Sequence, residues 1–228
     1  MDHKKLPSMV IAAIMWVFLT GESPLDGWPN CKERHGPTQD AVCKHGSLLK
    51  LYRQVKDNID LIKLGFVDSD MEQSIEQDFS SWLEWCDVCD GEVECLKNEF
   101  RKKLAILRGD HPDLPFTGAF IESDFGGIGI YPLGDRYLVG IQTAENSQIR
   151  WMCDAKGYGI RDGNKLLVAG REGEYKISIP IVLHDHQTLI IKETPKLRIV
   201  HEIICGWNGY IYGTYKRITV EEHKRRYR

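Results

Sequence analysis

Three cysteines fall within ten residues in the acidic stretch CDVCDGEVEC, which covers residues 86–95. Thiols at this spacing can form a redox pair, bind a metal ion or be oxidised to disulfides. Cys86 and Cys89 have the CxxC spacing of thiol oxidoreductases, but they follow a helical pattern instead of opening a helix. The neighbouring carboxylates of Glu84, Asp87 and Asp90 would raise the thiol pKa values, which argues against redox catalysis.

Two further groups of residues have types that can bind metals. A zinc site needs four ligands, and Cys86, Cys89 and Cys95 could be joined by His111. The triplet His184-Asp185-His186 lies between two strand-like runs, so we interpret it as a hairpin turn with exposed imidazoles. The sequence contains no GxSxG, no HExxH and no Gly-rich phosphate loop. We therefore expect no catalytic, metal-binding or cofactor-binding residues, and a protein that is not an enzyme.

The N-terminus has the order of a secretory signal peptide. Lys4 and Lys5 precede an uncharged apolar run from Met9 to Gly21. As a helix this run would span about 20 Å, whereas a bilayer core is about 30 Å thick. We expect residues 1–23 to be an export signal, with no stable membrane span after cleavage and a periplasmic or secreted mature chain. Since the residues around Gly21 make a poor cleavage site, an uncleaved signal is the alternative.

Composition limits the classes of partner. The chain has 228 residues, 42% of them hydrophobic, and a formal net charge of −3, which becomes about −4 if cleavage falls after about residue 21. Lys and Arg form no basic patch except in the tail EEHKRRYR, which we interpret as a solvated terminus, so we expect no nucleic-acid partner. Because cysteines pair in an oxidising compartment, the seven cysteines of an exported chain favour disulfides.

Apolar side chains first recur at helical spacing. Six of them predict one helix between Thr38 and Phe66, namely Leu48, Leu51, Tyr52, Val55, Ile59 and Ile62. The stretch Ser69–Glu72 has the form of a capping box that starts a second helix. A third helix is predicted by four residues on one face, namely Leu96, Phe100, Leu104 and Leu107.

The spacing of apolar residues changes after RGDHPDLP, residues 108–115. The prolines and the glycine of this stretch end the helical pattern. Beyond it, β-branched and aromatic runs alternate with turn formers. The expected strands are RYLVGIQTA, KLLVAG, EYKISIPIVL, QTLIIKE and RIVHEIIC. We expect an α+β protein of two domains, a helical domain over residues 24–110 and an antiparallel sheet or barrel over residues 115–228.

The helical half resembles the LprI-type lysozyme inhibitor domain of bacterial exported proteins. The resemblance covers residues 31–107 and is carried by NCKERHGPTQDAVC around Cys31 and Cys43, then by Cys89, Cys95-Leu96 and Phe100-Arg101. Cys86 departs from the family pattern. The β half is similar to extensions that follow such domains and end in a glycine-rich tail, here residues 205–217, for which no activity is implied.

The resemblance implies that the cysteines form disulfides, and it implies a function. The simplest pairs are Cys31 with Cys43, Cys89 with Cys95 and Cys153 with Cys205, which leaves Cys86 as a free or exchanging thiol. The implied function is inhibition of a lysozyme-like muramidase in the bacterial envelope. The alternative is an immunity or adaptor protein that neutralises another envelope-acting toxin through the β half.

We predict three disulfides and one free thiol in protein recovered from an oxidising compartment. Thiol titration in denaturant should count one thiol before reduction and seven after it, because export favours oxidation of paired cysteines. Three or more free thiols before reduction would contradict the disulfide interpretation.

Overall fold

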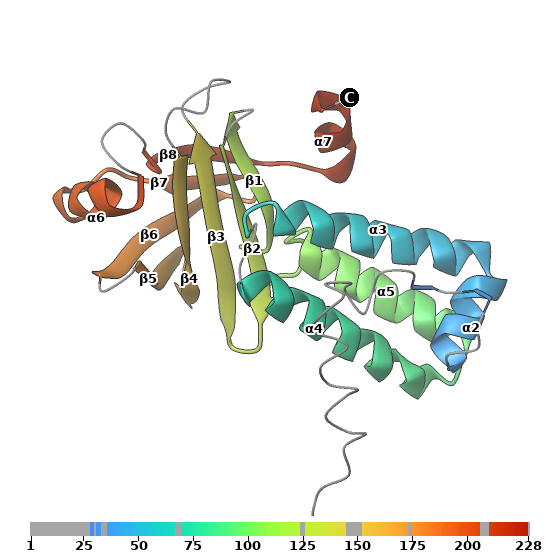
Figure 1. Cartoon of the computed structure of the whole chain (residues 1–228). Helices are drawn as coiled ribbons and strands as arrows, with labels where there is room; N and C mark the ends of the chain where they lie inside the picture. The colour runs from blue at the N-terminus through green and yellow to red at the C-terminus, as the bar shows by residue number, and fades with distance from the viewer. Residues whose placement is uncertain are drawn as a thin grey trace, which may run out of the picture.

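The structure is a computed structural model that describes residues 28–29, 31–32, 36–66, 70–123, 126–144, 152–172, 175–205 and 210–227. A layer of helices lies beside a closed antiparallel barrel, so the α+β class and the barrel are confirmed (Figure 1). The division into domains 24–110 and 115–228 stays a prediction. The expected signal peptide lies outside the described residues.

The helical layer is formed by the first half of the chain. Its elements are α2 (Pro37–Lys44), α3 (Gly46–Lys63), α4 (Asp70–Trp85), η1 (Cys86–Cys89) and α5 (Val93–Leu107). The helix predicted from Leu48 to Ile62 is confirmed as α3, and the residues before it form the separate helix α2, because the chain breaks at His45, which has extended backbone angles. The spacing of apolar residues did not predict this break, because Val42 before it and Leu48 after it are both buried. The expected cap Ser69 lies outside the described residues.

The barrel is an up-and-down meander. Its strands are β1 (Gly118–Ser123), β2 (Gly126–Leu133), β3 (Arg136–Ala144), β4 (Met152–Asp162), β5 (Lys165–Glu172), β6 (Tyr175–Asp185), β7 (Thr188–Ile191) and β8 (Gly213–Arg217). Each strand pairs with the next, and β8 closes the barrel on β1 through the pair Phe120 and Arg217. Buried apolar side chains fill the interior, among them Ile130, Val139 and Ile179.

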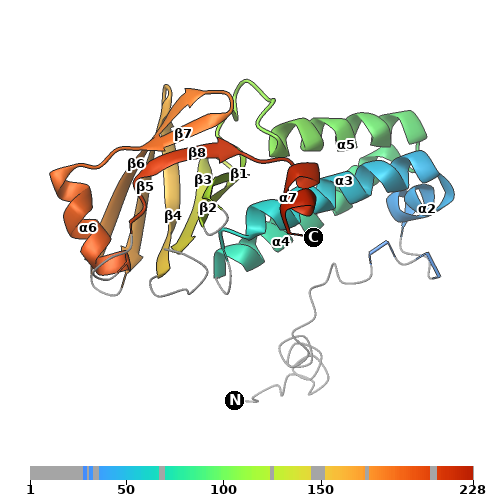
Figure 2. The ribbon, with the colours of Figure 1, turned by 90° about the horizontal axis from the view of Figure 1, so that it is seen from above.

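One end of the barrel is covered by α6 (Pro195–Cys205), which packs against β4 and β6 (Figures 1 and 2). The strand expected over RIVHEIIC was wrong, because these residues belong to this helix. Pro195 suits its first position, and the hydroxyl of Thr194 accepts a hydrogen bond from the N–H of Leu197 at 3.1 Å. At the other end, the ring of Phe116 is buried in the interior cluster.

The helices meet the barrel at a contact between backbones. Gly129 and Gly140 are cross-strand partners on β2 and β3, and Gly65 follows the end of α3. A methyl group on Gly129 would overlap the carbonyl oxygen of Ile62, and one on Gly140 would overlap that of Gly65. Only glycines therefore allow the end of α3 to approach the strands this closely.

Polar groups join the two layers beside this contact. The hydroxyl of Tyr131 on β2 donates to Asp78 Oδ2 on α4 at 2.6 Å, and Lys103 Nζ on α5 donates to both at 3.1 Å. Burial raises the pKa of Tyr131 well above its usual value, so its hydroxyl stays protonated as a donor. Because each group is satisfied by the others, the network adds specificity to an otherwise apolar contact.

The expected domain boundary, residues 108–115, is tied down by side chains of the barrel. Arg217 Nη2 donates to the carbonyl oxygen of Pro115 at 2.8 Å, and Nη1 donates to that of Thr117. Its Nε donates to the carbonyl of His186 at 3.0 Å, and His186 in turn contacts Asp110. The end of β8 therefore fastens both this connection and the β6–β7 turn.

The last helix, α7 (Val220–Arg226), lies against α3. Val220 is buried, and Lys224 Nζ lies 2.7 Å from Asp57 Oδ2. Within the part of the chain that the structure describes, no helix is long and apolar enough to cross a membrane.

We predict that Gly140→Ala lowers the free energy of unfolding by about 3 kcal/mol, because the added methyl group forces backbones apart. Urea unfolding followed by tryptophan fluorescence measures this. Gly46→Ala is the control, because a methyl group there meets no atom within 4 Å, and its effect should stay within about 1 kcal/mol. Equal stability of the two variants would contradict the close contact.

Candidate functional site

The end of the helical layer farthest from the barrel is formed by residues 84–94, which we call the acidic tip (Figures 1 and 2). It includes the end of α4, the short helix η1 and the start of α5. The turn between η1 and α5 is tight, because Asp90 and Gly91 have positive φ angles of 45° and 75°. The tip is thus a compact turn that projects from two long helices.

Covalent and hydrogen bonds hold the acidic tip in one shape. Cys89 and Cys95 form a disulfide across the turn, with Cα atoms 5.7 Å apart. The carboxylate of Glu92 accepts from the backbone N–H of Glu94 at 3.1 Å and from that of Cys95, which caps α5. Such a turn loses little conformational entropy when it binds a partner.

The acidic tip is also joined to α2. Asp87 Oδ1 accepts from the backbone N–H of Thr38 at 3.1 Å. The other end of α2 is bonded to the preceding chain by the disulfide of Cys31 and Cys43. Two disulfides therefore stabilise this end of the helical layer, within residues that the sequence singled out.

Two large apolar side chains are exposed on the acidic tip. Trp85 is 55% exposed and Val88 is 71% exposed. Aromatic rings pack in series within the layer: Phe79 and Trp82 are stacked with centroids 5.8 Å apart, and Trp82 and Phe100 are tilted with centroids 5.3 Å apart. An exposed tryptophan on a rigid support is typical of the residues that dominate binding at protein interfaces.

The surroundings of the two apolar side chains are negative. Residues 70–96 contain nine carboxylates and no lysine or arginine. The nine are Asp70, Glu72, Glu76, Asp78, Glu84, Asp87, Asp90, Glu92 and Glu94. Nearer the barrel, Lys63 pairs with Glu72 and Glu76, and Lys103 pairs with Asp78, so two positive charges offset most of the charge of these three carboxylates. At the tip, Lys97 pairs with Glu94. The negative charge is therefore concentrated toward the tip, where it would attract a basic protein.

Cys86 is the free thiol and is completely buried. Burial, with the carboxylates of Glu99 and Asp87, raises the pKa of this thiol to about 12. A nucleophilic or redox-active cysteine needs a lowered pKa and access to solvent. The environment of Cys86 is the opposite of the one that thiol catalysis requires.

The groups considered as metal ligands are not brought together. Cys89 and Cys95 are bonded to each other, so their sulfurs are unavailable to a metal with Cys86 and His111. His184 and His186 lie exposed at the β6–β7 turn, as the sequence predicts. Among the described residues, no three His, Cys, Asp or Glu side chains are grouped so as to hold a metal ion.

The remaining pair of cysteines lies in the barrel half. Cys153 on β4 and Cys205 at the end of α6 form the third disulfide. This bond fastens the helix over the end of the barrel and is far from the acidic tip in the fold (Figure 1). Its position indicates a structural role.

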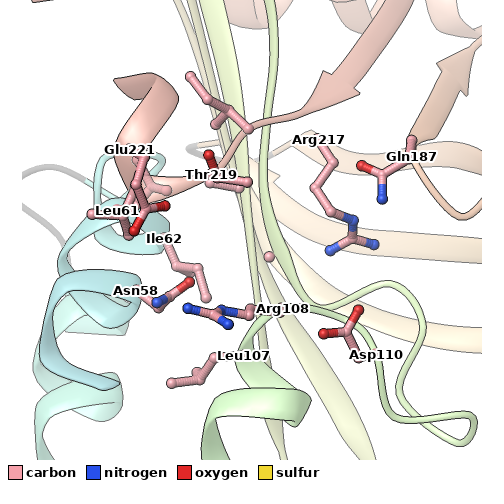
Figure 3. A pocket seen from close by; sticks show the side chains of 14 residues that line it. Asn58, Leu61, Ile62, Leu107, Arg108, Asp110, Gln187, Arg217, Thr219 and Glu221 are labelled. Atoms are coloured by element: carbon pink, nitrogen blue, oxygen red, sulfur yellow. The ribbon is translucent and has the colours of Figure 1, made fainter. Parts of the chain in front are cut away.

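A cavity of about 370 Å³ lies where α3, α5, β1 and α7 meet (Figure 3). Asn58, Arg108, Asp110, Arg217 and Glu221 line it. The N–H groups of Arg217 donate to the three backbone carbonyls described above. Two arginines and two carboxylates line the cavity, so its lining has no net charge. We regard this cavity as part of the junction between the helices and the barrel. We therefore place the candidate site at the acidic tip.

The comparisons with known proteins identify no relative. No family model, no curated protein and no solved structure matches this chain.

We predict that Cys86 does not react with an aromatic disulfide reagent at pH 8 in the native protein. With a pKa of about 12, only about 10⁻⁴ of the thiol is ionised at this pH, and the sulfur is buried. In urea one equivalent should react, and the Cys86→Ala variant should give none. Rapid reaction of the native protein would restore the redox interpretation.

Proposed function

We propose that this protein is a non-catalytic inhibitor that binds a lysozyme-like muramidase outside the cytosol, with the acidic tip as its contact surface. The observation that carries the proposal is the rigid acidic tip with Trp85 and Val88 exposed. The resemblance of residues 31–107 to LprI-type domains supports the choice of target.

The chemistry of the target fits this surface. A muramidase cleft holds two carboxylates, and an inhibitor that fills it needs a protruding shape and no nucleophile of its own. Many lysozymes are strongly basic proteins, so the carboxylates of Glu84, Asp90 and Glu92 would speed association. The side chains of Trp85 and Val88 would then supply the apolar contact that slows dissociation.

We assign the binding role to residues 24–110 and a supporting role to the barrel, residues 115–228. Buried apolar side chains line the barrel interior, and in this proposal the barrel serves as a base for the helices. Three disulfides fit a protein that folds in an oxidising compartment, and we propose the periplasm or the exterior of a bacterial cell.

The test is inhibition of peptidoglycan lysis by the full mature, oxidised chain, measured against several lysozymes at increasing salt. We predict that Trp85→Ala weakens inhibition about thirtyfold, because a central tryptophan supplies about 2 kcal/mol of binding energy. Glu84→Lys should weaken it about tenfold at low salt and less at high salt, since it acts on the charge attraction.

Ile199→Ala is the matched control, because Ile199 is 66% exposed but lies on α6, at the barrel end of the molecule. It should inhibit like the wild type. Absence of inhibition by the wild type across all lysozymes would refute the muramidase target and favour the toxin-immunity alternative. Inhibition that Trp85→Ala leaves intact would keep the function and remove the acidic tip from it.

A further inference from the structure

Away from the end where α6 packs on β4 and β6, the outer face of β4, β5 and β6 is not covered by α3 or α5, and the start of α4 borders it at Met71. Figures 1 and 2 place α3, α4 and α5 beside β1, β2 and β3, and show β4–β6 on the part of the barrel away from the helical layer. Outward-facing positions on a barrel exposed to water are normally polar. Here Ile160 is 68% exposed and Leu167 is 51% exposed, which is unusual for such a surface.

The strand register gathers these side chains into two neighbouring rows. Ile160 pairs with Leu167, which pairs with Pro180 on β6. In the next outward row, Tyr158 pairs with Ala169, which pairs with the exposed Ser178. A hollow of about 760 Å³, also lined by Met71, Lys156 and Lys176, continues the second row toward α4. We call these two rows and the hollow the apolar face.

The size of the apolar face indicates the strength of an interface. Taken together with its charged borders, the outer surface of the three strands is about 33 Å long and about 14 Å wide, which gives about 460 Å². Two such faces would bury about 900 Å² in total, below the 1,200 to 2,000 Å² of standard stable interfaces. The face therefore fits a weak, concentration-dependent dimer.

Its borders carry both signs of charge. Lys156 Nζ lies 2.7 Å from Asp154 Oδ2 at one border, and Asp162 pairs across the strands with Lys165 at the other. An anionic lipid surface or a strongly charged protein would meet repulsion at each border, and the chain as a whole has a net charge of −3. Under a two-fold axis, acidic and basic groups of one copy can face those of the other, so the face complements itself.

We propose that two copies of this chain associate through the apolar face with two-fold symmetry. Leu167 lies at the centre of the row from Ile160 to Pro180, so the two copies of Leu167 meet near the axis. Both acidic tips stay free, because they lie on the helical layer away from this face (Figures 1 and 2). The dimer thus offers two target-binding surfaces, independently of what the target is.

Sedimentation of the full oxidised chain over a range of concentrations tests the proposal. The wild type should shift from one to two chains as concentration rises. Leu167→Glu and Leu167→Lys should each associate at least about tenfold more weakly, because like charges face each other at the axis. Ile199→Glu, on exposed α6, is the control and should dimerise like the wild type.

Mixing the two charged variants distinguishes a two-fold contact from a folding defect. An equimolar mixture of Leu167→Glu and Leu167→Lys should recover the dimer, since opposite charges then meet. A wild type that stays a single chain at every concentration, or an unrestored mixture, would overturn the proposal. Open-ended polymers, or monomers that bind phosphatidylglycerol vesicles through this face, would overturn it as well.

Discussion

The arrangement of this molecule depends on a contact between main chains, where the end of α3 rests on β2 and β3. Three glycines, Gly65, Gly129 and Gly140, make this approach possible. A side chain at any of them would lift the helix from the sheet and expose buried residues such as Leu138 on the outer face of the barrel. The Asp78, Lys103 and Tyr131 network forms only when the layers are this close. Glycine therefore determines the position of the whole helical layer, and with it the direction in which the acidic tip points.

Rigidity at the tip and rigidity at the base are produced by different means. At the base, the barrel interior is filled with apolar side chains, and both ends are covered. At the tip, far from that core, two disulfides and hydrogen-bonded carboxylates replace the missing burial. This division is what a small projecting element needs, because a turn of eleven residues cannot bury enough apolar surface to stabilise itself.

Sequence patterns predicted the features that depend on local periodicity or on spacing. Helical spacing located α3, α4 and α5, and alternation located β3, β5, β6 and β7. The strand predicted over RIVHEIIC was wrong. Its β-branched residues are typical of a strand, but Pro195 and the capping Thr194 favour a helix. The sequence also indicated the cysteines and acids of the tip. The exposure of Trp85 and the close packing of Gly140 against Gly65 depend on contacts between segments that are distant in the sequence. No local sequence pattern predicts them.

Closure of the barrel has a consequence for the order in which the chain can fold. Every strand pair except one joins neighbours in the sequence, and the disulfides at the tip join cysteines only 12 and 6 residues apart. The final seam is different, since Arg217 bonds to Thr117 across a separation of 100 residues. Local contacts form early and distant ones late. Until β8 is synthesised, β1 and β7 therefore remain unpaired edges that can capture a strand of another chain, and the last strand is the one that protects the protein from aggregation.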